Sequence, residues 1–397
     1  NHQHLLRYFR INDPYRLVGL LILLLVIYFP LFLNVPGLTI PELQAMLIGE
    51  KLNEGSRMYS SLVDNSAPLG SWFYEVSDSV LGRSLQGRHI IAFMLTFLQG
   101  AYLGIVFINR KVFNENTYIP SFLFCLLFFF SFDTLSLSAE LVGFTFLLFA
   151  LSNLFKEIEF RVQHDETVFN VGLFISLASL FSFAFVVYLL CVVVILVFFT
   201  RSTPRKFLLL IFGFLLPHLL AISIAFLNDS LPRMWQYYYL ANLGFDREAF
   251  ISTKSLFILG LLPVVYLAVT IVILQREARF SKYQSQVLQI MFLWIGFSLL
   301  YVLYCKNLRP LIRMVVIPAF AFLSTHFFLF IRRRKFAEIN IWILMVGITT
   351  VSYLARYNKI SSVRYEKLLV AKEPGFENKR VLVLENDITW FSKNKLA

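Results

Sequence analysis

The chain has 397 residues, of which 58% are hydrophobic, 17% are aromatic and only 15% are charged, and 44 of them are Phe. A mean hydropathy of +0.70 excludes an ordinary soluble domain and indicates a polytopic helical membrane protein. The net charge of +12 comes largely from short loops between apolar segments, so it does not predict nucleic acid as a partner.

Eleven apolar segments are long enough to predict membrane-spanning helices, which makes the expected fold class all-α. The apolar run at 169–200 is too long for one upright helix at about 20 residues per crossing, so we divide it near Phe181 and Ser182. The predicted spans lie at about 17–33, 89–109, 118–136, 140–155, 169–182, 183–200, 206–227, 254–275, 287–305, 313–331 and 338–354.

Basic residues set the predicted orientation, because Lys and Arg collect in cytoplasmic loops. They gather in the short loops that share a side with the N-terminus, such as Arg110-Lys111. The N-terminus is therefore predicted to be cytoplasmic, and the odd number of spans places the C-terminus outside the inner (plasma) membrane. The predicted organisation is a transmembrane domain at 1–354, with a long outer loop at 34–88, and a short outer tail at 355–397.

The first outer loop begins with the pattern of a helix start. Thr39-Ile40-Pro41-Glu42 fits a capping box, and Leu43, Met46 and Leu47 follow at helical spacing. These residues predict a short amphipathic helix that lies on the membrane surface and ends near Gly55. Glu42 is thus either the third residue of a cap or a carboxylate that faces a cavity.

A turn and a second interfacial helix follow in the same loop. Tyr59 precedes Asp64-Asn65-Ser66-Ala67-Pro68, where Asp64 either closes an Asx-type turn or serves a site. The aromatic residues of 72–74 then predict a helix anchored at headgroup depth.

Later polar and aromatic segments add further candidates. Glu140 stands at the outer start of the fourth span, where a carboxylate could line a cavity or simply favour a helix N-terminus. The outer loop at 228–250 contains Trp235 and Tyr238, which could contact a sugar or form an interfacial belt. In the tail, residues 380–387 carry one strand pattern.

The order of these pieces resembles the GT-C superfamily of integral membrane glycosyltransferases, which includes protein O-mannosyltransferases and lipid A aminoarabinose transferases. The resemblance covers roughly residues 17–110. It rests on one span, the acidic Glu42 and its helix to Gly55, MYSSLVDNSAPLGSW at 58–72, LGRS at 81–84, and Arg88 at the next span. A looser likeness continues with Ser138-Ala139-Glu140, with Leu308-Arg309-Pro310, and with 313–318.

The resemblance implies a glycosyltransferase that moves a sugar from a polyprenyl-phosphate-linked donor to an acceptor on the outer face of the membrane. Such a reaction needs a carboxylate for the acceptor proton and cations for the leaving phosphate. Glu42 and Asp64 are the catalytic candidates, and Tyr59, Glu140, Trp235 and Tyr238 are expected to line the cavity. Arg309, Arg313 and Arg88 are the candidate partners of the donor phosphate.

Two departures from the family pattern keep a second function open. The family has an Asp, often followed by Glu, where this chain has Pro41-Glu42, and its second acid usually stands where Ser66-Ala67 are found. The alternative is a non-catalytic subunit of the same fold that docks partners of a cell-envelope assembly.

The expected ligands and partners follow from the same reading. They are membrane lipid, a lipid-linked sugar donor and, for the alternative, a protein at the outer loops and tail. No metal-binding motif is present, although Glu42 and Asp64 could share a divalent cation.

Overall fold

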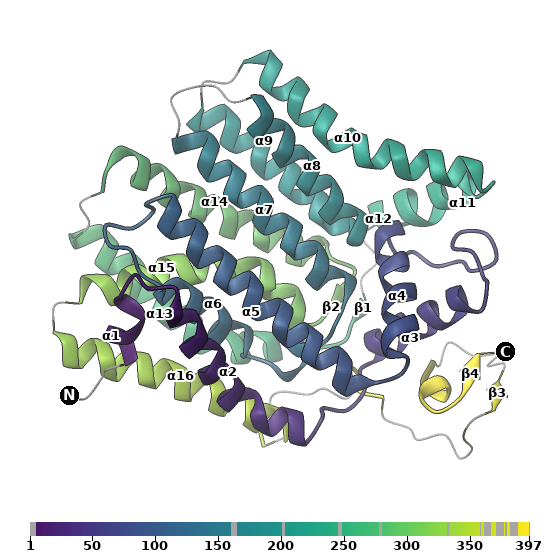
Figure 1. Cartoon of the computed structure of the whole chain (residues 1–397), viewed down its shortest axis with the longest axis horizontal. Helices are drawn as coiled ribbons and strands as arrows, with labels where there is room; N and C mark the ends of the chain where they lie inside the picture. The colour runs from purple at the N-terminus through teal and green to yellow at the C-terminus, as the bar shows by residue number, and fades with distance from the viewer. Residues whose placement is uncertain are drawn as a thin grey trace.

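Helices make up almost all of the structure. The computed structural model describes residues 5–159, 165–200, 203–244, 248–277, 280–331, 333–357, 359–360, 367–370, 377, 379–381 and 388–396. Long helices form a bundle, and α3 (Ile40–Asn53) and α4 (Pro68–Leu81) lie at one end of it, on the right in Figure 1. We call this the α3 end.

Eight helices of the described residues are long and apolar enough to cross a membrane, which confirms the all-α polytopic fold class. They are α2 (Tyr15–Leu33), α5 (Leu85–Asn109), α7 (Ala139–Glu159), α10 (Pro204–Leu227), α13 (Thr253–Glu277), α14 (Lys282–Tyr304), α15 (Ile317–Phe330) with its preceding 3₁₀ turn η4 (Pro310–Val316), and α16 (Arg334–Arg356). Shorter helices occupy the other three predicted spans: α6 (Ile119–Phe128), α8 (Asp165–Phe181) and α9 (Val187–Phe199). The number of crossings, eleven, and the orientation stay predictions.

Short elements join these helices. The predicted division of the apolar run at 169–200 is confirmed, because α8 ends at Phe181 and Ser182 takes an extended conformation before the turn η2 (Phe183–Val186). Two further short elements are α1 (Leu5–Arg10) and η1 (Phe132–Leu135).

Aromatic packing fills the centre of the bundle. Every residue of α6 is buried, and most of α15, which packs against it, is buried as well. Phe124 stacks on Phe144 of α7 with ring centroids 6.3 Å apart, and Phe107 and Phe113 meet edge to face. This placement explains why α6 and α15 carry no charged side chain in their helical residues.

The helices α8 and α10 approach each other closely through two glycines. A Cβ atom on Gly172 would lie 2.3 Å from the carbonyl oxygen of Leu210, and one on Gly213 would lie 2.2 Å from that of Phe169. Small residues at such crossings allow the two backbones to meet, as is common between membrane helices.

The cap that begins α3 has the predicted form, but the helix is more buried than expected. The Thr39 hydroxyl accepts from the Glu42 amide, and the Glu42 carboxylate accepts from the Thr39 amide at 3.1 Å. Leu43, Met46 and Leu47 are buried as predicted. Glu42 is also buried, because α4 and the tail pack on α3 and His89 of α5 lies 3.1 Å from its Oε1 atom.

Part of the C-terminal tail packs on α3 (Figure 1). Its described elements are the parallel strands β3 (Arg380–Val381) and β4 (Lys395–Leu396), with the 3₁₀ turn η5 (Ile388–Ser392) between them. Phe391 joins Leu43 and Leu47 in a small apolar cluster. The predicted strand at 380–387 is seen at its first two residues, and 382–387 lie outside the described residues.

The loop between α10 and α13 completes the α3 end. It contains α11 (Leu231–Met234), the π-helix η3 (Trp235–Leu240) and α12 (Ala241–Leu243). The strand β1 (Glu248–Ala249) then pairs in parallel with β2 (Asn307–Leu308), which follows α14. This pairing brings residues 305–309 beside α12, near α3 and α4.

Candidate functional site

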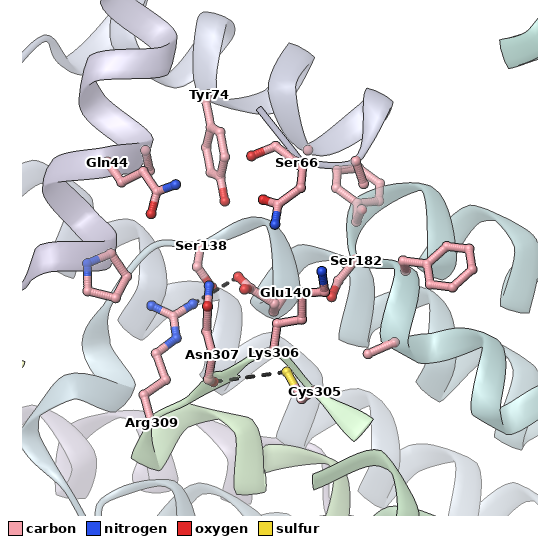
Figure 2. Close-up of a pocket in the computed structure, with 18 of the residues that line it drawn as sticks. Gln44, Ser66, Tyr74, Ser138, Glu140, Ser182, Cys305, Lys306, Asn307 and Arg309 are labelled. Atoms are coloured by element: carbon pink, nitrogen blue, oxygen red, sulfur yellow. Dashed lines mark hydrogen bonds and ion pairs between the residues drawn. The ribbon is translucent and has the colours of Figure 1, made fainter. Parts of the chain in front are cut away.

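A polar cavity of about 110 Å³ lies at the α3 end, between α3 and α4 on one side and the ends of α7, α8 and α14 on the other. Polar side chains point into it from three separate parts of the chain, as Figure 2 shows. They include Gln44, Ser66, Tyr74, Ser138, Glu140, Lys306, Asn307 and Arg309. Its apolar side is formed by residues at the break between α8 and η2.

Glu140 and Arg309 form an ion pair at the floor of this cavity. Arg309 Nη2 lies 2.9 Å from Glu140 Oε2, and Arg309 is only 4% exposed (Figure 2). Burial lowers the pKa of Arg309, but the Glu140 carboxylate, together with Tyr74, Asp133 and Cys305, raises it by more in total, so the guanidinium stays charged. Its Nε atom is buried and has no hydrogen-bond partner among the described residues, which is typical of a group that binds water or a ligand.

Lys306 supplies a second cation to the cavity. Its ammonium donates to the carbonyl oxygen of Ala241, and its backbone carbonyl accepts from the Glu248 amide at 2.8 Å. Within the described ranges no carboxylate lies at ion-pair distance from its Nζ atom. The cavity therefore has more positive charge on this wall than Glu140 neutralises.

Glu42 lines the opposite wall, and both of its oxygens are engaged. Oε2 accepts from the Thr39 hydroxyl at 2.7 Å, and Oε1 lies 3.1 Å from His89 Nε2 of α5. Burial raises the pKa of Glu42, but the interactions with His89 and Thr39 outweigh it and leave the pKa below its ordinary value. Glu42 is thus both a cap residue and an ionised cavity carboxylate.

Asp64 adopts the turn that was the alternative to a role in the site. Its Oδ2 accepts from the Ser66 amide at 2.9 Å and from the Ser66 hydroxyl, and its Oδ1 accepts from Gln44 at 3.4 Å. Asn65, Ser66 and Ala67 line the cavity, whereas Asp64 stands behind them.

The three candidate arginines do not converge. Arg88 is buried under the turn between α4 and α5, where it donates to Ser77 and to the Gly82 carbonyl at 2.9 Å. Arg313 lies in a separate apolar groove between α13 and α14. Only Arg309 lines the polar cavity.

The aromatic candidates lie beside the cavity instead of lining it. Tyr59 and Tyr238 belong to a buried cluster, where Tyr238 donates to the Ser179 carbonyl at 2.9 Å. Trp235 is 51% exposed, as a residue of an interfacial belt would be. Among the described residues, no three His, Cys, Asp or Glu side chains gather as a metal site would require.

Several cavity residues were missed from the sequence. Lys306 and Asn307 stand between two spans, where their polarity has an ordinary explanation as a loop, and Tyr74 was assigned to the membrane interface. His89 was missed because it meets Glu42 across 47 positions of sequence. The sequence signal that could have indicated Lys306 and Asn307 was the basic segment CKNLR at 305–309, which directly precedes the predicted span at 313–331.

The bundle matches a known sequence family. A family model described as "Family of unknown function (DUF6427)" matches residues 82–361. The chain belongs to the DUF6427 family. The match includes all helices from α5 to α16 and begins after α3 and α4. Glu140, Lys306 and Arg309 therefore lie inside the matched region, and Glu42 lies outside it. No curated protein matches this DUF6427 member.

Two solved structures share the fold. ArnT from Cupriavidus metallidurans bound to undecaprenyl phosphate matches with a TM-score of 0.58 and 11% identity, over 96% of this chain and 85% of that one. ArnT in the apo state matches with the same TM-score and 14% identity, over 87% of this chain and 65% of that one. These matches confirm the GT-C resemblance of the DUF6427 member, and at such identities they show the fold alone.

Proposed function

We propose that this DUF6427 protein is a membrane glycosyltransferase that moves a sugar from a polyprenyl-phosphate-linked donor to an acceptor at the outer face of the membrane. The observation that carries the proposal is the cavity at the α3 end, where Lys306 and Arg309 face Glu42 across a small polar space. The GT-C fold supports it, as does the undecaprenyl phosphate named in one of the matched ArnT structures.

The donor phosphate is assigned to Lys306 and Arg309. Cleavage of the bond between the sugar and the phosphate leaves negative charge on the phosphate, which two cations in a partly dehydrated cavity stabilise. Arg309 is already held by Glu140, so its orientation costs little when the ligand binds. The apolar residues at the break between α8 and η2 then face the start of the polyprenyl chain.

Glu42 is assigned to the acceptor. The acceptor oxygen attacks the anomeric carbon, the bond to the phosphate oxygen breaks, and the polyprenyl phosphate leaves with the electron pair. The acceptor proton passes to the Glu42 carboxylate, which its lowered pKa keeps ionised at neutral pH and ready to accept. His89 stands behind Glu42 and holds its Oε1 atom in place.

A second candidate function is a non-catalytic subunit that docks partners. The observation that favours it is that both predicted catalytic carboxylates are hydrogen-bonded to residues close by in the sequence: Glu42 closes a helix cap and Asp64 closes a turn. The tail that packs on α3 would then present its other face to a partner.

Measuring the binding of undecaprenyl phosphate to the purified protein in nanodiscs distinguishes the glycosyltransferase from the docking subunit. A hydrogen bond to a charged group contributes about 1.5–3 kcal/mol, so Lys306→Ala should weaken binding by roughly 10- to 150-fold. Lys254→Ala, which removes an exposed cation from the same end of the bundle, should leave binding unchanged. Binding that is absent, or equally weakened by both substitutions, would contradict the transferase.

A further inference from the structure

A second cavity, of about 310 Å³, lies between α13 and α14 and is almost entirely apolar. Its walls come from these two helices, from η4 and the start of α15, and from Leu127, Phe130 and Leu308. The lining residues other than Thr253 and Arg313 are hydrophobic, Gly or Pro. We call this the α13–α14 groove.

The groove opens on the surface of the bundle that faces lipid. Phe257, Leu299 and Leu303 line it and are 60%, 56% and 65% exposed. Because α13 and α14 are both long enough to cross the membrane, these exposed side chains meet acyl chains. A lipid can therefore enter the groove sideways from the bilayer.

Among the residues that the structure describes, Arg313 is the one charged side chain that lines the groove. Its guanidinium lies over the ring of Phe130, 5.8 Å from the centroid, and against Gly260, where a Cβ atom would be 2.5 Å from Nη1. Within the described part of the chain, no carboxylate lies at ion-pair distance from it. An arginine in an apolar membrane setting is costly, so its charge calls for an anionic partner.

The α13–α14 groove is separate from the polar cavity. Side chains alternate along the extended segment that forms β2: Asn307 and Arg309 line the polar cavity, and Leu308 between them lines the groove. Residues 307–309 are thus a wall between the two spaces.

We infer that the α13–α14 groove binds one anionic glycerophospholipid of the surrounding bilayer, with its phosphodiester on Arg313 and an acyl chain between α13 and α14. The charge separates a phosphodiester lipid from a free polyprenyl phosphate, which is a monoester. A phosphate monoester carries about −1.5 to −2 at neutral pH, whereas a phosphodiester carries a single charge that one guanidinium matches. A sugar-linked polyprenyl donor is also a phosphodiester, but Thr253 and Arg313 are the only polar residues among the described ones that line the groove, too few for a sugar. The inference is independent of the proposed transfer reaction.

Lipid competition on the whole protein tests this inference. The purified chain is placed in nanodiscs with equal amounts of phosphatidylglycerol and phosphatidylcholine, and the lipids that remain bound after release into detergent are counted by native mass spectrometry. We expect one phosphatidylglycerol per chain, retained at least about tenfold over phosphatidylcholine, since a charge-assisted contact contributes about 1.5–3 kcal/mol. Equal retention of the two lipids in the wild-type protein would overturn the inference without any variant.

Variants locate the site. Arg313→Gln should abolish the preference, and Arg313→Lys should keep part of it because the charge remains. Arg57→Gln is the matched control, since Arg57 is an exposed arginine at the same end of the bundle. A preference that survives Arg313→Gln, or displacement of the bound phosphatidylglycerol by an equal amount of undecaprenyl phosphate, would also overturn the inference.

Discussion

Glu42 combines a structural and a chemical role in one side chain. Its backbone amide and one carboxylate oxygen close the cap of α3, while the other oxygen meets His89 and the chain around it lines the polar cavity. A capping residue alone would not need a histidine from another helix behind it.

The two roles of Glu42 can be separated by mutation. We expect Glu42→Gln to abolish sugar transfer while the protein stays folded, because the amide cannot receive the acceptor proton. Thr39→Ala removes the cap but leaves the carboxylate, so it should cost about 0.5–2 kcal/mol of stability and keep most activity. Transfer activity and thermal unfolding of both variants are the measurements. Full activity of Glu42→Gln would show that Glu42 is only a cap.

The lowered pKa of Glu42 predicts how its contribution depends on pH. A carboxylate whose pKa falls on folding stabilises the protein fully above its ordinary pKa of 4.5, and this contribution disappears as the pH falls through the lower folded value. The difference in unfolding temperature between wild type and Glu42→Gln should therefore stay constant from about pH 7 down to the ordinary pKa of 4.5 and shrink as the pH falls further, to about pH 3. A difference that stays constant below the ordinary pKa as well would contradict the assigned shift.

At the scale of residues, the sequence predicts what is local. The capping box of Thr39 and Glu42 spans three positions, and the Asx-type turn at Asp64 spans two, so both could be recognised. The partners of Glu42 and Arg309 lie 47 and 169 positions away, and no local pattern indicates them. Lys306 was visible only as a loop charge for the same reason.

At the scale of elements, the ion pair between Glu140 and Arg309 joins the first turn of α7 to the segment after β2. Removing Arg309 leaves the Glu140 carboxylate, which is only 15% exposed, without its cation, so Arg309→Ala should cost about 1–3 kcal/mol of stability. The double substitution Glu140→Gln with Arg309→Met leaves no unpaired charge and should cost clearly less. Unfolding of the single and double variants measures this coupling. Equal destabilisation by the two would mean that the pair does not hold the elements together.

The crossing of α8 and α10 depends on small residues. Gly172→Val would place side-chain atoms against the Leu210 carbonyl and should destabilise the protein by about 1–3 kcal/mol. Gly296→Ala in α14 is the control, because no atom lies within 4 Å of the Cβ position there. Thermal unfolding in the same detergent compares them. An unchanged unfolding temperature for Gly172→Val would show that the two helices can separate at no cost.

The bounds of elements were predicted well where the hydropathy of the sequence determines them. The burial of elements was predicted poorly where packing against distant segments determines it. The break at Ser182 follows from the length of the apolar run around it. The burial of α3 could not be foreseen, because it results from packing against α4 and against the tail, and the tail reaches Leu43 and Leu47 from more than 300 positions away.

At the scale of the whole molecule, the chain joins an apolar bundle to a polar α3 end. The fold class follows from composition, because 58% hydrophobic residues leave few alternatives to membrane helices. The cavity depends on how three distant segments converge at one end, and the sequence predicted only two of its charged walls, at Glu42 and at Glu140 with Arg309. The separation of Arg309 and Arg313 into two spaces also follows only from the alternation along β2.

The most direct test of the account is a cryo-EM structure of the protein in nanodiscs that contain undecaprenyl phosphate. The account predicts phosphate density in the polar cavity, in contact with Lys306 and Arg309 and facing Glu42, with the polyprenyl chain leaving past the break between α8 and η2. A cavity without lipid phosphate at a saturating concentration, or one covered by a stably bound protein, would contradict the glycosyltransferase and favour the docking role.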